Sequence, residues 1–186
     1  MGLKFNIDDR TKNNIREWVE SIVIALVLAL FVRAFIVQAF KIPSGSMRPT
    51  LIERDRILVN KFIYRFKEPQ RGDIIVFRYP EDRKKDFVKR LVALPGETIS
   101  IKDGNIYIDD KIVEGPHIIR EIYYYNRGDY GQEGKAVKVP EGFFYGLGDN
   151  SASSRDSRYW GFIPKRDMLG RAFVIYWPPN RIRILK

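Results

Sequence analysis

The sequence of 186 residues contains no cysteine and a single histidine, His117. A chain without cysteine forms no disulfide bond, no thiolate-bound zinc or iron–sulfur site, and no cysteine nucleophile. A single histidine disfavours most histidine-based metal sites and a Ser-His-Asp catalytic triad. We therefore expect neither a metal ion nor a cofactor, and a hydrolase built from this chain would need a general base other than histidine.

Several catalytic motifs are also missing. No serine stands at the centre of a G-x-S-x-G pattern, which excludes the nucleophile turn of the α/β-hydrolases. No serine is followed three residues later by lysine, as it is in penicillin-binding proteins. No G-x-x-x-x-G-K-[ST] phosphate-binding loop occurs either, so the common nucleotide-hydrolase site is excluded.

The composition is that of a globular protein, with 45% hydrophobic and 30% charged residues. The length fits one folded domain with a short additional segment. The 33 basic and 23 acidic residues give a net charge of +10, which suggests nucleic acid or an anionic membrane surface as a partner. An ordinary solvated surface with charges of both signs is an equally good explanation of this balance.

Near the N-terminus lies an uninterrupted apolar run, Ile22–Val32, which continues beyond Arg33. The twenty residues of Trp18–Val37 would form a helix about 30 Å long, close to the hydrocarbon thickness of a bilayer. We predict one N-terminal transmembrane anchor helix over residues 18–40, preceded by a cytoplasmic tail over residues 1–17.

Two alternatives to a membrane anchor remain open for this segment. It could be a buried core helix, because its uncharged run is shorter than the roughly 18 residues typical of a membrane span. It could also be a cleaved secretory signal, because Val37 and Ala39 have the −3 and −1 spacing of a cleavage site. The basic residues do not indicate an orientation, since four precede the segment and four follow it closely.

From Lys41 onward, short runs of β-branched and aromatic residues alternate with turn residues, which is typical of β-strands. No long helical pattern recurs between these runs, so a parallel α/β sheet is disfavoured. Residues 41–186 are therefore predicted to form a mainly β domain with antiparallel sheets. The predicted strands are Arg56–Val59, Asp73–Phe77, Phe87–Val92, Thr98–Ile101, Asn105–Ile108, Phe143–Tyr145 and Arg171–Tyr176.

Two local features between the strands can also be predicted. Lys102–Asn105 indicates a β-hairpin, because its Asp-Gly pair favours a tight turn between two alternating runs. Residues 115–138 are predicted to form a variable excursion from the core, a β-ribbon with a flexible tip. The tyrosines Tyr123–Tyr125 in it could stack on nucleic-acid bases, although packing or membrane-interface contact is favoured.

Three segments carry residues that could perform chemistry. The first, Ile42–Leu51, places Ser44 and Ser46 on either side of a glycine and between two prolines. The second is Lys89, which lies within a strand that is otherwise suited to burial. The third, residues 148–158, is a loop with four serines and two charges of each sign. Each segment taken alone also has an ordinary structural explanation.

Taken together, these segments closely resemble four ordered motifs of bacterial type I signal peptidases. The Ser-Gly-Ser-Met-x-Pro-Thr motif of that family is matched by Ser44–Thr50, and its Arg-Gly-Asp motif by Arg71–Phe77. The Lys-Arg motif, which ends in Leu-Pro-Gly-Asp/Glu, is matched by Lys89–Glu97, and the Gly-Asp-Asn motif by Gly148–Gly161. Only residues 115–138 of the predicted β domain lie outside the pattern, which implies a catalytic domain of the signal-peptidase type.

The resemblance implies a serine protease with a Ser/Lys dyad. Ser46 would be the nucleophile and Lys89 its general base, which agrees with the scarcity of histidine. Because a lysine is normally protonated at neutral pH, this role requires burial to lower its pKa. Ser44 would join the Ser46 backbone N–H in an oxyanion hole, and Ser154 would hydrogen-bond to the lysine amine and orient it.

The resemblance also implies supporting residues behind the dyad. Asp156 and Arg158 would form an ion pair, Asp149 would belong to the same supporting loop, and Arg90 would leave the opposite face of the lysine strand. Two shallow apolar pockets would select the substrate, and our candidates to line them are Ile42, Met47 and Val88.

The implied substrates are exported preproteins, cut after small residues at positions −1 and −3. The enzyme would be a monomer that contacts membrane lipids and no nucleic acid. Its catalytic domain, residues 41–186, would face the exported side of the bacterial cytoplasmic membrane, with the N-terminus inside. Two alternative functions are a self-cleaving repressor-type Ser/Lys protease, which should carry a DNA-binding domain, and a basic membrane-tethered nucleic-acid-binding protein, which would not need all four motifs.

Overall fold

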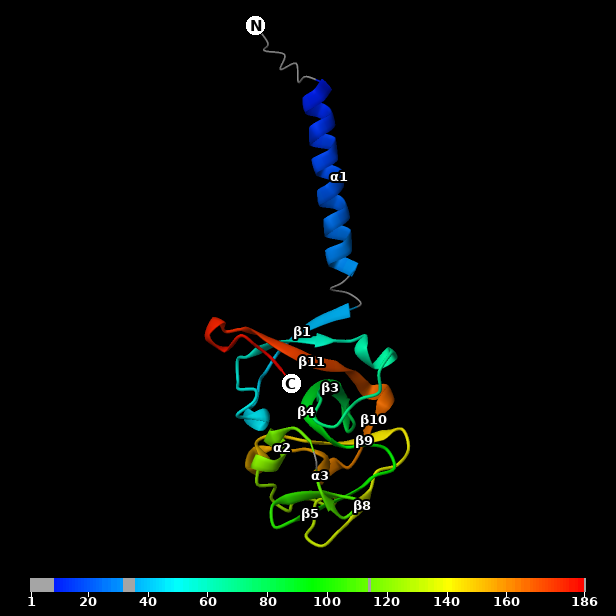
Figure 1. The fold of residues 1–186 in the computed structure, drawn as a ribbon, viewed down its shortest axis with the longest axis vertical. Coiled ribbons are helices and arrows are strands. Elements are labelled where there is room, and N and C mark those ends of the chain that lie inside the picture. The colour runs from blue at the N-terminus through cyan, green and yellow to red at the C-terminus, as the bar shows by residue number, and fades with distance from the viewer. Residues whose placement is uncertain (1–8, 32–35, 114, 186) are drawn as a thin grey trace. The chain divides into compact units, whose positions relative to one another are not determined.

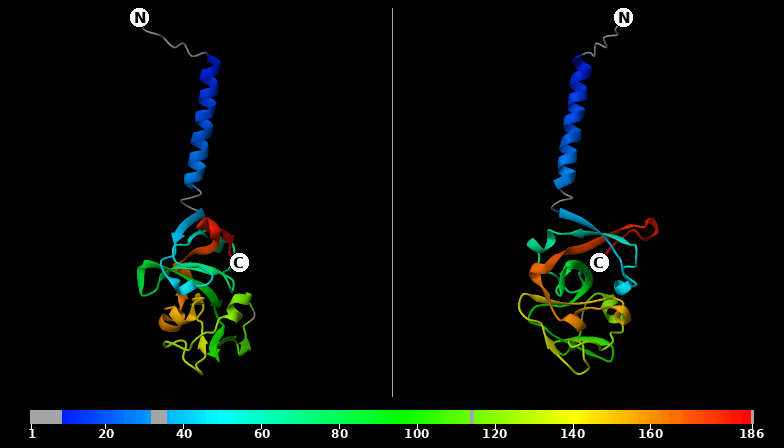
Figure 2. Two further views of the ribbon diagram at one scale, coloured as in Figure 1. Left: turned by 90° about the vertical axis from the view of Figure 1, so that its left-hand side faces the viewer. Right: turned by 180° about the vertical axis from the view of Figure 1, so that it is seen from behind.

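The computed structural model describes residues 9–31, 36–113 and 115–185, and the chain forms two compact units that divide between Val37 and Gln38. The first unit contains one long helix, α1 (Asp9–Phe31). The second unit is built mainly of antiparallel strands (Figures 1 and 2). The prediction of a mainly β fold after an N-terminal helix is therefore confirmed for the described residues.

Helix α1 begins inside the segment predicted as a tail. Arg16 Nε and Glu20 Oε1 form an ion pair at 2.8 Å one turn apart, which helps to explain why the polar residues continue the helix. The large apolar side chains that α1 carries between Ile15 and Leu30 are at least half exposed. Within the described ranges, no helix combines the length and the apolar composition that crossing a membrane requires.

The predicted helix over residues 18–40 is wrong at its C-terminal end. Val37–Lys41 form strand β1, which lies at one edge of a sheet beside β2 (Arg56–Asn60). The β-branched Val37 and the aromatic Phe40 favour this extended conformation. The backbone N–H and C=O groups of β1 need hydrogen-bond partners in either conformation. Pairing with β2 supplies them, so a further helical turn is not needed.

The larger sheet has eight strands among the described residues, in the order β1-β2-β11-β3-β4-β9-β10, with β12 paired to β11. The smaller sheet has the order β7-β6-β5-β8 and lies at the opposite end of the domain from β1 and β2 (Figures 1 and 2). The remaining strands are β3 (Ile74–Tyr79), β4 (Asp82–Ala93), β5 (Thr98–Lys102), β6 (Asn105–Ile108), β7 (Lys111–Ile112), β8 (Val137–Lys138), β9 (Phe143–Leu147), β10 (Ile163–Pro164), β11 (Met168–Trp177) and β12 (Arg183–Ile184).

One hydrophobic cluster attaches the serine-rich segment to the larger sheet. Ile42, Met47 and Leu51 are each at most 3% exposed and pack against residues of β2, β3 and β11. A second cluster joins the smaller sheet to the ends of β4 and β9. Burial of these side chains fixes the serine segment against the sheet that carries Lys89.

All seven predicted strands are found, and the predicted hairpin is confirmed. In the antiparallel pair of β5 and β6, Lys102 lies opposite Asn105. The turn residues Asp103 and Gly104 have φ angles of 49° and 75°, as a tight hairpin turn with two left-handed residues requires.

The prediction of a β-ribbon over residues 115–138 is wrong. The described part of this excursion contains the short helix α2 (His117–Glu121) and strand β8, and is otherwise irregular. Part of its backbone bonds instead to the short helix α3 (Ser157–Trp160): Tyr130 N donates to Arg158 O at 2.9 Å. His117 is exposed and pairs with Glu121 at 3.1 Å, away from the candidate catalytic residues.

Candidate active site

Ser46 and Lys89 lie in direct contact although 43 positions separate them in the sequence. Lys89 Nζ donates a hydrogen bond to Ser46 Oγ at 2.8 Å. Ser46 lies in a 3₁₀ turn, η2 (Gly45–Met47), which follows the extended backbone of Ser44. The structure thus brings the predicted nucleophile and the predicted base to hydrogen-bonding distance.

The nucleophile turn is held from both sides. Met47 is 1% exposed and anchors one side of the turn in the hydrophobic core. On the other side, Asn150 Nδ2 donates to Gly45 O at 3.0 Å, and Asn150 N donates to Ser46 O at 3.0 Å. Sequence reasoning assigned no role to Asn150, although its place directly after Gly-Asp in a predicted turn was a usable signal.

Lys89 lies on β4 and is 3% exposed. Burial in a poorly hydrated site lowers the pKa of its amine to about 8, and the Arg158 charge adds to this effect. The Asp156 and Asp149 carboxylates act in the opposite direction and raise the lysine pKa, but burial outweighs them. About a tenth of the molecules therefore carry a neutral amine at neutral pH.

Arg90, the next residue of β4, faces the other side of the strand, as strand alternation requires. Its Nε and Nη2 donate to the two oxygens of Asp149 at 2.8 and 2.7 Å, and its Nη1 donates to Gly72 O at 2.8 Å. Both side chains of the Arg90–Asp149 pair are at most 1% exposed. Asp149 thus supports the strand that carries the lysine.

Asp156 and Arg158 form a second fully buried ion pair. Arg158 Nε and Nη2 each donate to one oxygen of Asp156 at 2.8 Å, and Gly148 N donates to Asp156 Oδ2 at 3.1 Å. The pair therefore connects the loop over residues 148–158 to the end of β9, close behind Lys89.

Ser154 is 4% exposed, but its Oγ has no hydrogen-bond partner within the described residues. The hydrogen bond expected between Ser154 and the lysine amine is therefore not formed in this structure. Ser154 nevertheless lies beside the nucleophile turn. A Cβ added at Gly148 would lie 2.1 Å from Ser154 Oγ and 2.5 Å from Ser46 O, so glycine is required there for the two segments to pack together.

A cavity of about 550 Å³ opens onto Ser46 and Lys89. Ser44 lines it, and its exposed side chain makes no capping bond to the 3₁₀ turn. The three residues proposed for the substrate pockets, Ile42, Met47 and Val88, also line this cavity. Sequence reasoning missed four charged residues of the cavity wall: Arg48, Glu53, Asp86 and Arg155.

Within the described ranges, no group of histidine, aspartate and glutamate side chains is arranged to hold a metal ion. The groups that the structure brings together at the site are a serine hydroxyl and a buried amine. A nucleophile in contact with a base of lowered pKa, beside a cavity, is an arrangement typical of covalent hydrolysis.

Comparisons with known proteins agree with this chemistry. A family model described as "Signal peptidase, peptidase S26" matches residues 15–177. A probable signal peptidase I-2 of Synechocystis sp. is 40% identical over 177 residues, which cover 90% of this chain and 77% of the relative. A signal peptidase I of Leptolyngbya laminosa is 41% identical, with 89% and 81% covered, and signal peptidase I P of Bacillus subtilis subsp. natto is 35% identical, with 98% and 100% covered. This chain therefore belongs to the signal peptidase family, peptidase S26.

Proposed function

We propose that this chain removes N-terminal signal peptides from exported preproteins, with Ser46 as the nucleophile and Lys89 as the general base. The observation that carries the proposal is the 2.8 Å contact between the Ser46 hydroxyl and the buried Lys89 amine at the wall of a cavity. The family membership of the chain supports the same activity, since its relatives are named signal peptidases.

In the acylation step, the neutral Lys89 amine accepts the Ser46 proton while Oγ attacks the carbonyl carbon of the −1 residue. The resulting tetrahedral intermediate collapses and the peptide C–N bond breaks. The Lys89 ammonium then gives its proton to the leaving nitrogen, which becomes the N-terminus of the mature protein. The signal peptide remains bound to Ser46 as an ester.

In the deacylation step, the same amine activates water. Neutral Lys89 accepts a proton from a water molecule as its oxygen attacks the ester carbonyl carbon. Collapse of this second intermediate releases the signal peptide carboxylate, and Ser46 Oγ recovers a proton from the lysine. One base of lowered pKa therefore serves both halves of the reaction.

Ser154 is proposed to orient the amine during these steps. Buried hydroxyls nearly always find a hydrogen-bond partner, whereas Ser154 Oγ has none among the described residues. When Lys89 is neutral, the Ser46 hydroxyl can donate to its nitrogen, and a turn of the amine toward Ser154 would let one of its two remaining hydrogens reach Ser154 Oγ. Asp149, Asp156 and Arg158 are proposed to support this geometry through the two buried ion pairs.

Ser44→Ala is expected to lower kcat by about 10²–10³-fold with little change in KM, because an oxyanion-hole donor acts mainly in the transition state. Its hydroxyl and the Ser46 N–H are proposed to receive the developing negative charge. Ser153→Ala is the matched control, since Ser153 lines the same cavity and has no assigned role. Steady-state cleavage of a preprotein peptide measures kcat and KM of both variants. Equal kcat values for Ser44→Ala and Ser153→Ala would reject the oxyanion role.

The proposed substrate is an extended segment with small residues at −1 and −3. Strand β9 pairs with β4 only from Arg90 onward, so among the described residues no strand pairs with this edge of β4 before Lys89, beside the cavity. A peptide could pair with such an edge through its backbone. Ile42, Met47 and Val88 would then limit the side chains that fit at −1 and −3.

A membrane anchor is proposed for the N-terminal segment. The large exposed apolar side chains of α1 and the apolar run Ile22–Val32 support contact with lipid rather than with water. The enzyme would then be a single-pass monomer with its N-terminus inside and its catalytic domain on the exported side. Confining enzyme and preprotein to one membrane would raise their effective concentration, and the net charge of +10 would favour anionic headgroups.

The purified full-length chain in detergent is expected to cut a preprotein with Ala-x-Ala before the mature sequence at one position, after the −1 alanine. A preprotein with phenylalanine at −1 should resist cleavage, because the proposed pocket admits only small side chains. Mass spectrometry of the products identifies the bond, and Ser46→Ala controls for a contaminating protease. Equal cleavage of both preproteins, or cleavage by the Ser46→Ala variant, would contradict the proposed function.

A further inference from the structure

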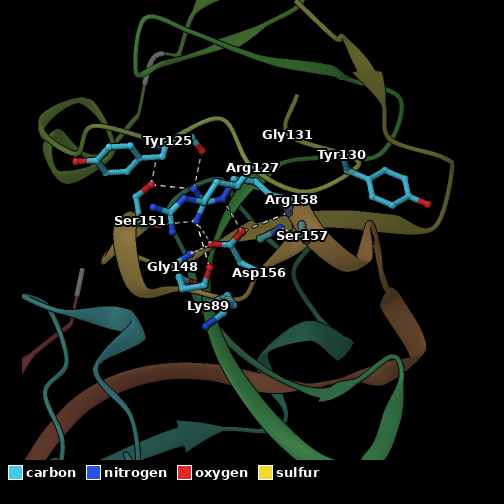
Figure 3. A network of polar contacts seen from close by, with 12 residues as sticks. Lys89, Tyr125, Arg127, Tyr130, Gly131, Gly148, Ser151, Asp156, Ser157 and Arg158 are labelled. Atoms are coloured by element: carbon cyan, nitrogen blue, oxygen red, sulfur yellow. Dashed lines mark hydrogen bonds and ion pairs between the residues drawn. The ribbon is translucent and has the colours of Figure 1, made fainter. Parts of the chain in front are cut away.

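A loop of the excursion, Tyr125–Gly131, closes over the buried Arg158. Arg158 Nη1 donates to Tyr125 O at 2.8 Å, and Tyr130 N donates to Arg158 O at 2.9 Å. Tyr125 N donates to Ser151 Oγ at 3.0 Å, and the same oxygen accepts from Arg158 Nη1 at 2.9 Å. Figure 3 shows Arg158 enclosed by these groups, so the 125–131 loop supplies part of the hydrogen bonding that a buried guanidinium needs.

Two glycines allow this close approach. A Cβ added at Gly128 would lie 2.2 Å from Arg158 O, and one added at Gly131 would lie 2.5 Å from Arg127 O within the loop and 2.7 Å from Arg158 Cγ. All three distances are far below van der Waals contact, and at Gly128 the neighbour is backbone that cannot rotate away. The backbone of the 125–131 loop is therefore packed directly on Arg158.

Arg158 in turn connects the loop to the catalytic residues. It holds Asp156, whose Oδ2 accepts from Gly148 N at 3.1 Å. Gly148 packs against Ser154 and against Ser46 O. In Figure 3, Lys89 lies beside Asp156, on the side away from the loop. A continuous set of contacts thus runs from the 125–131 loop through Arg158 and Asp156 to the dyad.

We propose that the 125–131 loop is a positioning element for the catalytic base: by closing over Arg158, it holds the Asp156–Arg158 pair in place and keeps the surroundings of Lys89 dry. This inference rests on the proposed function, since it takes Lys89 to be the base. No residue of the loop lines the cavity at the dyad, so the loop acts through Arg158 and through the neighbouring serine loop that Tyr125 and Arg127 contact.

The groups around Lys89 determine the direction of the expected effect. Asp156 and Asp149 favour the ammonium form, while burial and Arg158 favour the neutral amine. The Ser46 hydroxyl and the Phe87 ring, whose centroid is 5.7 Å from Nζ, are the uncharged neighbours. The charged residues of the cavity wall are Arg48, Glu53, Asp86 and Arg155. Displacing the loop would hydrate the site and free Asp156 from Arg158, and both changes raise the lysine pKa.

The test compares alanine at three glycines of the same excursion. Gly128→Ala and Gly131→Ala force the loop away from Arg158. Gly134→Ala is the matched control, because Gly134 has a φ of +71°, close to the +65° of Gly128, but an added Cβ there meets nothing within 4 Å. The control therefore carries similar backbone strain without displacing the loop. The rate of single-turnover cleavage of a preprotein peptide is measured against pH with the full chain in detergent.

Gly128→Ala and Gly131→Ala are expected to move the midpoint of the pH–rate profile upward by about one unit, which lowers the rate at neutral pH about tenfold. At high pH, where the amine is neutral in every variant, their rates should approach that of Gly134→Ala. An unchanged midpoint overturns the inference. A profile that is uniformly lowered without a shift also overturns it, because loss of folded protein alone would give that result.

Arg127→Ala provides a milder test if the glycine variants fail to fold. The exposed Arg127 donates from Nη1 to Ala152 O at 2.7 Å, which ties the 125–131 loop to the serine loop at the surface. A smaller upward shift of the midpoint supports the inference, and no shift overturns it. Failure of the proposed function would give a different result. In that case the Ser46→Ala variant would keep its cleavage activity, or the wild-type rate would not rise with pH.

Discussion

Lys89→Arg is expected to abolish signal-peptide cleavage as completely as Lys89→Ala. Arginine keeps the positive charge and much of the length of lysine, but its guanidinium is not deprotonated in a protein and cannot accept the Ser46 proton. Lysine can accept it, because burial lowers the Lys89 pKa to about 8. At neutral pH about a tenth of the molecules then carry the neutral amine.

The rate of single-turnover cleavage measures this loss, with circular dichroism to establish that both variants are folded. Both rates should fall at least about 10³-fold, to the background given by Ser46→Ala. The wild-type rate should rise with pH through about 8, since the base is active only after it loses its proton. Substantial activity of Lys89→Arg would mean that the lysine supplies only charge. His117 does not offer a substitute base, because it is exposed and pairs with Glu121.

The strands could be predicted from the sequence because short runs of β-branched and aromatic residues stand between turn residues. In β3, an apolar run fits a strand buried on both faces, and all four residues of Ile74–Phe77 are buried. The Asp-Gly pair predicted the β5–β6 hairpin because its conformation is local. Irregular segments lack such a signal. Within residues 115–138, the 125–131 loop follows the shape and hydrogen-bonding needs of Arg158, which lies outside the excursion, so no pattern within the excursion could predict the path of this loop.

The dyad was predicted from motif resemblance, since residue spacing alone does not bring Ser46 and Lys89 together. The path between them runs through β2, β3 and the turns that connect them, and it depends on packing across the whole sheet. Asn150 was missed for the same reason: its two hydrogen bonds to the nucleophile turn join residues about a hundred positions apart. The expected bond between Lys89 and Ser154 likewise depends on exact geometry that a motif does not contain, and Ser154 Oγ has no partner among the described residues.

Asp149→Asn is expected to be among the most destabilising single changes in the domain. The substitution keeps the shape of the side chain but removes the charge that compensates Arg90, and both residues are at most 1% exposed. A buried charge that loses its partner typically costs about 3–5 kcal/mol of folding free energy. The hydrogen bond from Arg90 to Gly72 O remains, but a neutral carbonyl does not replace a carboxylate.

Denaturant unfolding followed by tryptophan fluorescence measures this cost, with Glu68→Gln as the matched control. Glu68 also pairs with a cation, Lys165, but the two side chains are 78% and 43% exposed, so breaking their pair should change stability little. A double variant, Arg90→Met with Asp149→Leu, should recover part of the loss, because it removes both buried charges together. If Asp149→Asn lowers the unfolding midpoint no more than Glu68→Gln does, the pair does not stabilise the strand that carries Lys89. Holding that strand against the Gly148–Arg158 loop would then fall to the Asp156–Arg158 pair. This pair is equally buried, and its Asp156 accepts from the backbone N–H of Gly148, directly after β9, the strand that pairs with β4.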